Sequence, residues 1–252
     1  MSWTTVAWSE SKAIAATWEK LDAVPDQHIK TAGDSIYINK YNKLLGGYAI
    51  LGAESLGARF VSPTIRRFAP VELTPLTLAL LPVTPIDINI HPGKSVDLAV
   101  DEQLEAEFYG TAGAAVQEAI IAWLADADIT PVKGQIFSVR ATITAAIVAG
   151  VWTYSNLTFA EDLPVGVYDM VGFDCVAAEG AVVRLIPVGG DNRPGVPVRQ
   201  LVSNIQIGDK FRYGNMGVMC TFQHNNVPGA EIFGLSAEAS ETYQCIVDLI
   251  KR

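Results

Sequence analysis

Hydrophobic and polar residues alternate along much of the chain. The alternation runs through residues 36–38, 86–91, 96–100, 137–144 and 243–249. A period of two places successive side chains on opposite faces of a strand, so these segments predict half-buried β-strands. Short strands separated by Gly and Pro are typical of sandwiches and barrels. The pattern therefore predicts an all-β chain.

One segment near the N-terminus, residues 9–22, has a helical period instead. Ser9 could cap its first turn, and Pro25 would end it because the residue before a proline avoids helical geometry. The apolar residues at spacing i, i+4, i+7 are Ile14, Trp18 and Leu21. We expect a short N-terminal helix with these side chains on one face.

Residues 115–126 fit either a helix or a buried strand. The apolar run at 120–124 suits a strand, and its spacing also suits a helix. We prefer the strand because of its place in an internal repeat.

The repeat consists of one Gly-Tyr unit that occurs twice, 120 residues apart. The matched pairs are Gly46 and Gly166, Tyr48 and Tyr168, and Gly52 and Gly172. Each unit is followed by a second apolar run and then by Pro63 or Pro187. The shared order favours duplication over a chance match. We expect a tight turn at the glycine and then a strand with an inward tyrosine.

The repeat divides the chain into two halves. Residues 128–134 combine a proline, a glycine and polar side chains between two apolar strands, as a linker does. We therefore expect an N-terminal helical arm at 1–25, a first domain at 26–130 and a second at 131–252. Domains of this size with short strands fit two tandem jelly-roll β-sandwiches, although Greek-key sandwiches are also compatible.

Composition and charge narrow the range of possible functions. Half of the 252 residues are hydrophobic, 18% are charged and the net charge is −9. Because the cationic residues are few and scattered, direct nucleic-acid binding is not expected. The N-terminus does not have the pattern of a signal peptide, and no apolar stretch is long enough for a transmembrane helix.

Few residues suggest catalysis or metal binding. Cys175, Cys220 and Cys245 lie far apart without CxxC spacing, which favours buried thiols, and the three histidines show no zinc pattern. The polar candidates are Asp191 and Asn192 for calcium, Asp126 and Asp128 as paired carboxylates, and the acidic stretch Glu102, Glu105 and Glu107. For each, a surface loop or strand is the preferred interpretation. We expect no catalytic, cofactor or metal residues and no enzyme.

Several segments of the second half together resemble a known family. They include Phe137-Ser138-Val139-Arg140-Ala141, Pro164-Val165-Gly166-Val167-Tyr168 and Arg193-Pro194-Gly195. Residues 135–198 resemble the second half of major capsid proteins from tailless icosahedral bacteriophages, in particular the lipid-containing single-stranded DNA phages of flavobacteria.

The resemblance implies a double jelly-roll subunit in a virion shell. It implies a homotrimer with a pseudo-six-fold outline, neighbouring capsomers, penton or other minor capsid proteins, and a nearby viral membrane, with assembly in the host cytoplasm. Trp3, Trp8 and Trp18 could reach such a membrane, but the segment lacks a cationic face, so packing against protein is preferred. The alternatives are a carbohydrate-binding β-sandwich (a lectin, adhesin or viral spike) and a jelly-roll carbohydrate-active enzyme.

Overall fold

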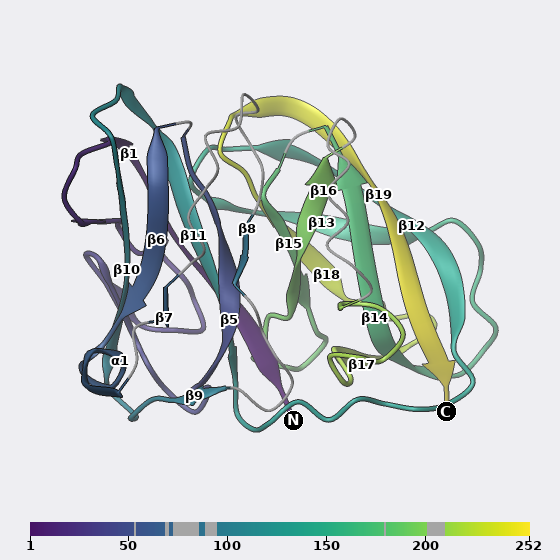
Figure 1. The fold of residues 1–252 in the computed structure, drawn as a ribbon. Coiled ribbons are helices and arrows are strands. Elements are labelled where there is room, and N and C mark those ends of the chain that lie inside the picture. The colour runs from purple at the N-terminus through teal and green to yellow at the C-terminus, as the bar shows by residue number, and fades with distance from the viewer. Residues whose placement is uncertain (53, 69–70, 73–85, 89–94, 179, 201–209) are drawn as a thin grey trace. The chain divides into compact units, whose positions relative to one another are not determined.

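A computed structural model describes the chain except residues 53, 69–70, 73–85, 89–94, 179 and 201–209. The chain divides into two compact units (Figure 1). The N-terminal unit comprises Thr5–Asp126, and the C-terminal unit comprises Met1–Thr4 together with Ala127–Arg252. Both units are built from β-strands. Among the described residues, no helix is long and apolar enough to cross a membrane.

The N-terminal unit contains two sheets and one short helix, α1 (Pro63–Phe68). Its strands are β1 (Trp3–Ala13), β2 (Glu19–Lys20), β3 (Thr31–Ala32), β4 (Ser35–Tyr37), β5 (Lys43–Ile50), β6 (Ser55–Val61), β7 (Val71–Glu72), β8 (Ile86–Ile88), β9 (Val96–Asp97), β10 (Gln103–Gly110) and β11 (Ala115–Ala125). One sheet has the order β1-β11-β5-β8, and the other has the order β3-β4-β10-β6-β7. Strand β9 pairs with β5, and β2 pairs with β10.

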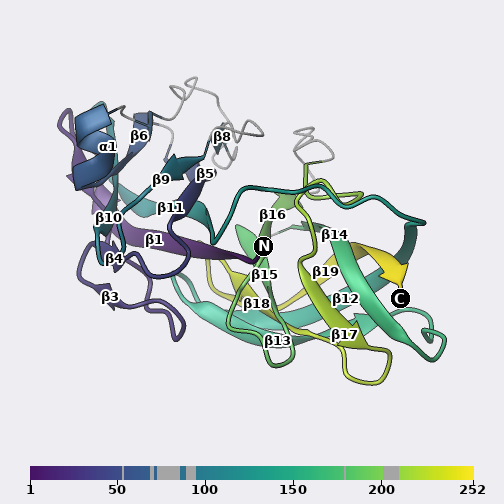
Figure 2. The same ribbon diagram turned by 90° about the horizontal axis from the view of Figure 1, so that it is seen from below.

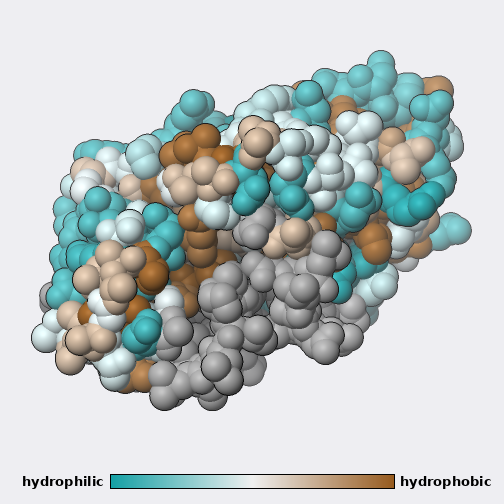
Figure 3. Space-filling view, turned by 90° about the horizontal axis from the view of Figure 1, so that it is seen from above, coloured by the Kyte–Doolittle hydropathy of each residue, from teal (hydrophilic) through white to brown (hydrophobic). Residues whose placement is uncertain are grey.

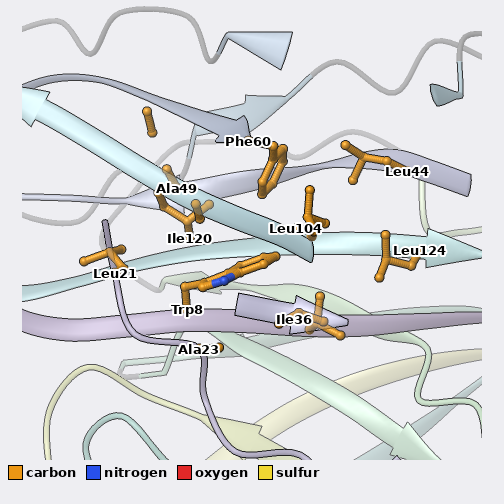
Figure 4. Packing of buried hydrophobic residues seen from close by; sticks show 14 of the residues in the cluster. Trp8, Leu21, Ala23, Ile36, Leu44, Ala49, Phe60, Leu104, Ile120 and Leu124 are labelled. Atoms are coloured by element: carbon orange, nitrogen blue, oxygen red, sulfur yellow. The ribbon is translucent and has the colours of Figure 1, made fainter. Parts of the chain in front are cut away.

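The core of this unit lies between its two sheets (Figure 4). Leu104 on β10 and Ile120 and Leu124 on β11 point into it, as does Phe60 on β6. Each is at most 1% exposed. Burying one such side chain stabilises the fold by about 1.5–3 kcal/mol. The apolar run of β11 therefore forms a buried strand, as predicted.

The predicted N-terminal helix is wrong. Residues 3–13 form β1, and the segment turns back to pair Glu19 and Lys20 with β10. Ser9 caps no helix, because its hydroxyl donates to the backbone oxygen of Glu118 at 2.7 Å. Ile14 and Leu21 are buried all the same, but each follows directly after the end of a strand, β1 and β2 respectively, and does not lie on a helical face. Pairing in the sheets satisfies the backbone hydrogen-bonding groups of this segment, and this tertiary pairing outweighs the helix that the apolar spacing predicts.

Strand β9 is shorter than the alternation at 96–100 predicts. It ends at Asp97, and Val100 lies beyond it with 61% of its surface exposed. The strand predicted at 86–91 is present as β8, and Ile90 lies outside the described residues.

The C-terminal unit contains a single continuous path of strands. They are β12 (Phe137–Ile147), β13 (Trp152–Phe159), β14 (Val167–Ala177), β15 (Val182–Ile186), β16 (Gly195–Gln200), β17 (Cys220–Gln223), β18 (Gly229–Phe233) and β19 (Glu238–Lys251). The order is β16-β15-β18-β13-β12-β19-β14-β17, and a parallel pairing of β14 with β16 joins the path back on itself (Figure 2).

The long strands β12 and β19 pair over almost their whole length. Ala141 and Ile143 on β12 lie opposite Cys245 and Tyr243 on β19, and all four are buried. The residues between them face outward, so the alternation predicted for both strands is confirmed.

The two units share one strand order. When β2, β3 and β9 are left out, the remaining described strands of the N-terminal unit, which include the equally short β7, rank one to eight as β1, β4, β5, β6, β7, β8, β10 and β11. In both units, four of the strands pair side by side in the rank order 1-8-3-6, and the other four pair in the rank order 2-7-4-5. The N-terminal half-paths are β1-β11-β5-β8 and β4-β10-β6-β7, and the C-terminal ones are β12-β19-β14-β17 and β13-β18-β15-β16.

The repeated Gly-Tyr unit falls on the third-ranked strand in both units. Tyr48 lies on β5 and Tyr168 on β14, and each is at most 1% exposed, so both tyrosines point inward as predicted. Burial raises the pKa of Tyr48 well above its ordinary value. The hydroxyl of Tyr168 donates to the backbone oxygen of Pro164.

The predicted turn at the glycine holds for one copy only. Gly166 lies in a bend just before β14. Gly46 lies inside β5, where the pairing with β11 shifts by one residue between Trp123 and Leu124. Gly46 has a φ of 130°, a conformation that a residue with a Cβ rarely adopts. This glycine therefore permits a β-bulge rather than a turn.

Candidate functional sites

The acidic stretch at 102–107 is held by specific partners. Glu102 accepts hydrogen bonds from the backbone N–H of Thr64 at 2.7 Å and of Ala99 at 2.8 Å, and so fastens the start of α1. Burial would raise the pKa of Glu102, but hydrogen bonds from Ser62, Thr64 and Ala99 outweigh it and lower the pKa. Glu105 pairs with Lys20 at 2.9 Å. These carboxylates serve the fold.

Glu107 belongs to a cluster of four side chains on the outer face of the β6–β10 pair. Arg59 lies directly opposite Glu107, and its Nε donates to Oε2 at 2.7 Å. The guanidinium of Arg59 lies 4.0 Å from the ring centroid of Trp18, which is itself 4.4 Å from the ring of Tyr109. Such stacking adds a cation–π attraction to the ion pair.

The same four-membered cluster occurs in the C-terminal unit. Arg184 on β15 lies opposite Glu231 on β18, and its Nε donates to Oε2 at 2.7 Å. Its guanidinium lies 3.7 Å from the ring centroid of Trp152, whose ring is 5.3 Å from that of Phe233.

The two clusters use strands of equal rank. In each cluster the arginine lies on the fourth-ranked strand. The glutamate lies on the seventh-ranked strand, and an aromatic residue follows it two positions later. Neither cluster is evident from one sequence segment alone. The arginines within the two apolar runs after the repeated unit, together with the pattern Glu-x-aromatic, could have indicated it.

The C-terminal unit also contains a buried ion pair. Asp248 on β19 is fully buried, and both its oxygens are satisfied. Arg212 donates through Nε to Oδ2 at 2.6 Å and through Nη2 to Oδ1 at 2.8 Å. Ser138 donates to Oδ1 at 2.6 Å, and the N–H of Tyr213 donates to Oδ2 at 2.9 Å.

These hydrogen bonds decide the charge of Asp248. Burial would raise the pKa of Asp248, but the hydrogen bonds from Arg212, Ser138 and Tyr213 outweigh it and lower the pKa. The hydrogen bond to Asp248 raises the pKa of Arg212 in turn. Gly172 makes room for this carboxylate, because a Cβ there would come within 2.2 Å of Oδ2. The pair fastens the segment around Arg212 to the sheet.

A second buried carboxyl, Glu118, has no cationic partner among the residues that the structure describes. Glu118 on β11 is fully buried in the N-terminal unit, and its Oε2 accepts the N–H of Gly52 at 2.8 Å. Its Oε1 has no hydrogen-bond partner within the described part of the chain. Burial raises the pKa of Glu118 to about 7; the hydrogen bond from Gly52 opposes the rise and the charge of Glu54 adds to it.

The remaining sequence candidates do not assemble into a site. Asn192 donates to the backbone oxygen of Met219 at 3.1 Å, and Arg193 donates to the backbone oxygens of Gly190 and Asn192, which closes the loop on itself. Asp126 and Asp128 are exposed beyond the end of β11. Across the described ranges, no group of three or more His, Cys, Asp or Glu residues could hold a metal ion.

The outer face of β12 and β19 is exposed and almost uncharged. Thr142 lies opposite Gln244, Thr144 opposite Thr242, and Arg140 opposite Ile246. The hydroxyls of Thr144 and Thr242 are 3.3 Å apart, and Ile246 is 37% exposed. On the side of the molecule drawn in Figure 3, groups of hydrophobic residues lie among hydrophilic ones.

Comparison with known proteins gives only distant likenesses. No protein-family model and no curated protein sequence matches the chain. Among solved structures, the major capsid protein P2 from bacteriophage PM2 is similar at 10% identity and a TM-score of 0.26, over 99% of this chain and 98% of that one. The STIV major capsid protein is similar at 8% identity and a TM-score of 0.24, over 98% and 97%. At these TM-scores the likeness carries no argument about this chain, and neither protein is described as coming from a flavobacterial phage.

Proposed function

We propose that the chain is a major capsid protein with a double jelly-roll fold, which acts by self-assembly. A jelly roll is an eight-stranded sandwich in which one sheet has the order 1-8-3-6 and the other 2-7-4-5. The observation that carries the proposal is that both units follow this order. The resemblance of residues 135–198 to phage capsid proteins agrees with it on separate grounds.

The outer face of β12 and β19 supports assembly through sheet faces. Covering Thr and Gln side chains costs less than covering charged ones, and the centres of protein interfaces are depleted of charged residues. The exposed Ile246 adds apolar surface to this face. In the proposed shell, three copies form a pseudo-hexameric trimer, and trimers tile an icosahedral virion together with penton and other minor proteins. We also propose that a viral membrane lies beneath the shell.

Sedimentation velocity over a wide concentration range tests the proposal. We expect a stable species of three times the 27.1 kDa chain mass. A monomer at every concentration contradicts it, and a monomer that also gives a saturable signal on a glycan array supports the carbohydrate-binding alternative.

A matched pair of variants tests the face itself. Gln244→Glu combined with Ile246→Glu adds two charges to the β12–β19 face, and we expect it to weaken the trimer because charged groups are costly to cover. Asn225→Glu combined with Asn226→Glu, in the exposed segment after β17, adds two charges elsewhere and serves as the control. Equal sedimentation of both variants contradicts the assignment of this face.

A further inference from the structure

Two thiols face each other inside the C-terminal unit. Cys175 on β14 lies directly opposite Cys245 on β19. Their sulfur atoms are 3.5 Å apart, both cysteines are free, and they are 0% and 2% exposed. The third cysteine, Cys220, lies on β17 opposite Met170.

The backbone geometry suits a covalent bond between these two residues. Directly opposite residues in antiparallel strands have Cα atoms about 4.5–5.5 Å apart. A disulfide accepts Cα separations of about 4.4–6.8 Å and brings the sulfurs to roughly 2.05 Å. The sulfurs therefore need to approach by a rotation of the side chains, without moving either strand out of register.

We propose that Cys175 and Cys245 are a modification site, at which a disulfide-type oxidant forms a bond between the third and last strands of the C-terminal unit. This inference does not depend on the proposed function in assembly. In a shell protein the bond would join strands within one subunit, so it would strengthen the subunit and not the contacts between subunits.

The reaction is thiol–disulfide exchange with oxidised glutathione as the oxidant. One cysteine thiolate attacks a sulfur of the oxidant, so that a mixed disulfide forms and one glutathione thiolate leaves. The other cysteine thiolate then displaces the second glutathione and closes the protein disulfide. The two cysteines lose two electrons to the oxidant, and their two protons end on two glutathione thiols.

Burial controls the rate of this reaction. Burial, together with the neighbouring thiol of Cys245, raises the pKa of Cys175 well above its ordinary value, so few thiolates exist in the folded protein. Because the thiolate is the attacking species, we expect slow oxidation of the folded chain and faster oxidation during refolding, before the strands close.

The bond should stabilise the unit noticeably. The two residues are 70 positions apart in sequence, so the bond restricts a long segment of the unfolded chain. A cross-link of this kind typically raises the melting temperature by roughly 5–15 °C in a domain of this size.

The test is to refold the full chain in a glutathione buffer and map its thiols by alkylation and mass spectrometry. We expect a mass lower by about 2 Da, corresponding to the loss of two hydrogens, with Cys175 and Cys245 linked and Cys220 alkylated. Cys220→Ser is the matched control and should still form the bond, whereas Cys245→Ser should not. The melting temperature of the oxidised wild type should fall to that of the reduced form on adding dithiothreitol.

Two results would overturn the proposal. One is alkylation of all three thiols after refolding with excess oxidised glutathione, and the other is a disulfide that includes Cys220. Both are read on the wild-type chain, so they hold even where a serine variant fails to fold. Sedimentation of the reduced chain tests the assembly proposal separately, because the trimer does not require the bond.

Discussion

The last strands of the two units each bury a carboxyl group, but within the described ranges only one of these groups is paired with a cation. Glu118 on β11 and Asp248 on β19 are both fully buried. Asp248 lies against Arg212 and its pKa is lowered, whereas Glu118 accepts the N–H of Gly52 and its pKa is raised to about 7. Burial acts on both in the same direction, and the partner decides the outcome. Equal strand rank thus does not imply equal electrostatics.

The two four-membered clusters show the opposite lesson. Each has an arginine on the fourth-ranked strand, a glutamate and an aromatic residue on the seventh-ranked strand, and a tryptophan against the arginine. The tryptophan lies between β1 and β2 in one unit (Trp18) and on β13 in the other (Trp152). Exposure differs as well: the side chain of Arg59 is 29% exposed and that of Arg184 is 2% exposed. Strands of equal rank thus hold a similar arginine–glutamate pair in both units, although the surroundings of the pair differ.

The largest effect is expected from removing the cation beside Asp248. Arg212→Met should lower the free energy of unfolding at pH 7 by about 3–5 kcal/mol, because it leaves a buried carboxylate without its partner. Arg252→Met removes an exposed arginine that pairs with Asp169 and is the control, with no resolvable change expected. Urea-induced unfolding measures both.

The pH dependence of the wild type gives a second test of the same pair. Because the folded pKa of Asp248 is lowered, its contribution to stability is present above the unfolded value of about 3.9 and is lost as the pH falls through the folded value.

Equal urea midpoints for Arg212→Met and Arg252→Met would contradict a buried, paired Asp248.

A smaller effect of opposite sign is expected at Glu118. Its pKa rises from 4.5 to about 7 on folding, so stability is full below pH 4.5 and falls as the pH rises towards 7. Glu118→Gln should remove this fall and stabilise the protein at pH 8 by about 1–3 kcal/mol. Glu161→Gln, at an exposed glutamate in the bend after β13, is the control. A variant as sensitive to pH between 5 and 7 as the wild type would count against this assignment.

The smallest effect concerns the two arginine–glutamate pairs. Double-mutant cycles to alanine at Arg59 with Glu107 should give a coupling of about 0.5–1 kcal/mol, since the arginine is partly solvated. The cycle at Arg184 with Glu231 should give about 1–3 kcal/mol, because its arginine is buried. If the first coupling is the larger, exposure does not govern these pairs.

The alternation of apolar residues was sufficient to predict the long strands β12 and β19. Ile143 and Tyr243 lie on the buried faces of β12 and β19 because a period of two allows no other arrangement in a sheet with one face on a core. The repeated tyrosines also predicted an inward residue at the same place in both units.

Other features depend on contacts that a single sequence does not reveal. The segment around Ile14 has helical spacing, but pairing of its neighbours with β10 and β11 decides its structure. The partner of Asp248 lies 36 residues away in sequence, and the glutamate opposite Arg184 lies 47 residues away. Such pairs follow from strand order, which sequence spacing alone did not fix.

Negative-stain electron microscopy of the purified, refolded chain tests the central claim most directly. The proposed capsid subunit predicts uniform particles with a hexagonal outline, formed by three copies of two similar sandwiches. Particles of single-chain size under conditions where the protein is folded would contradict the claim.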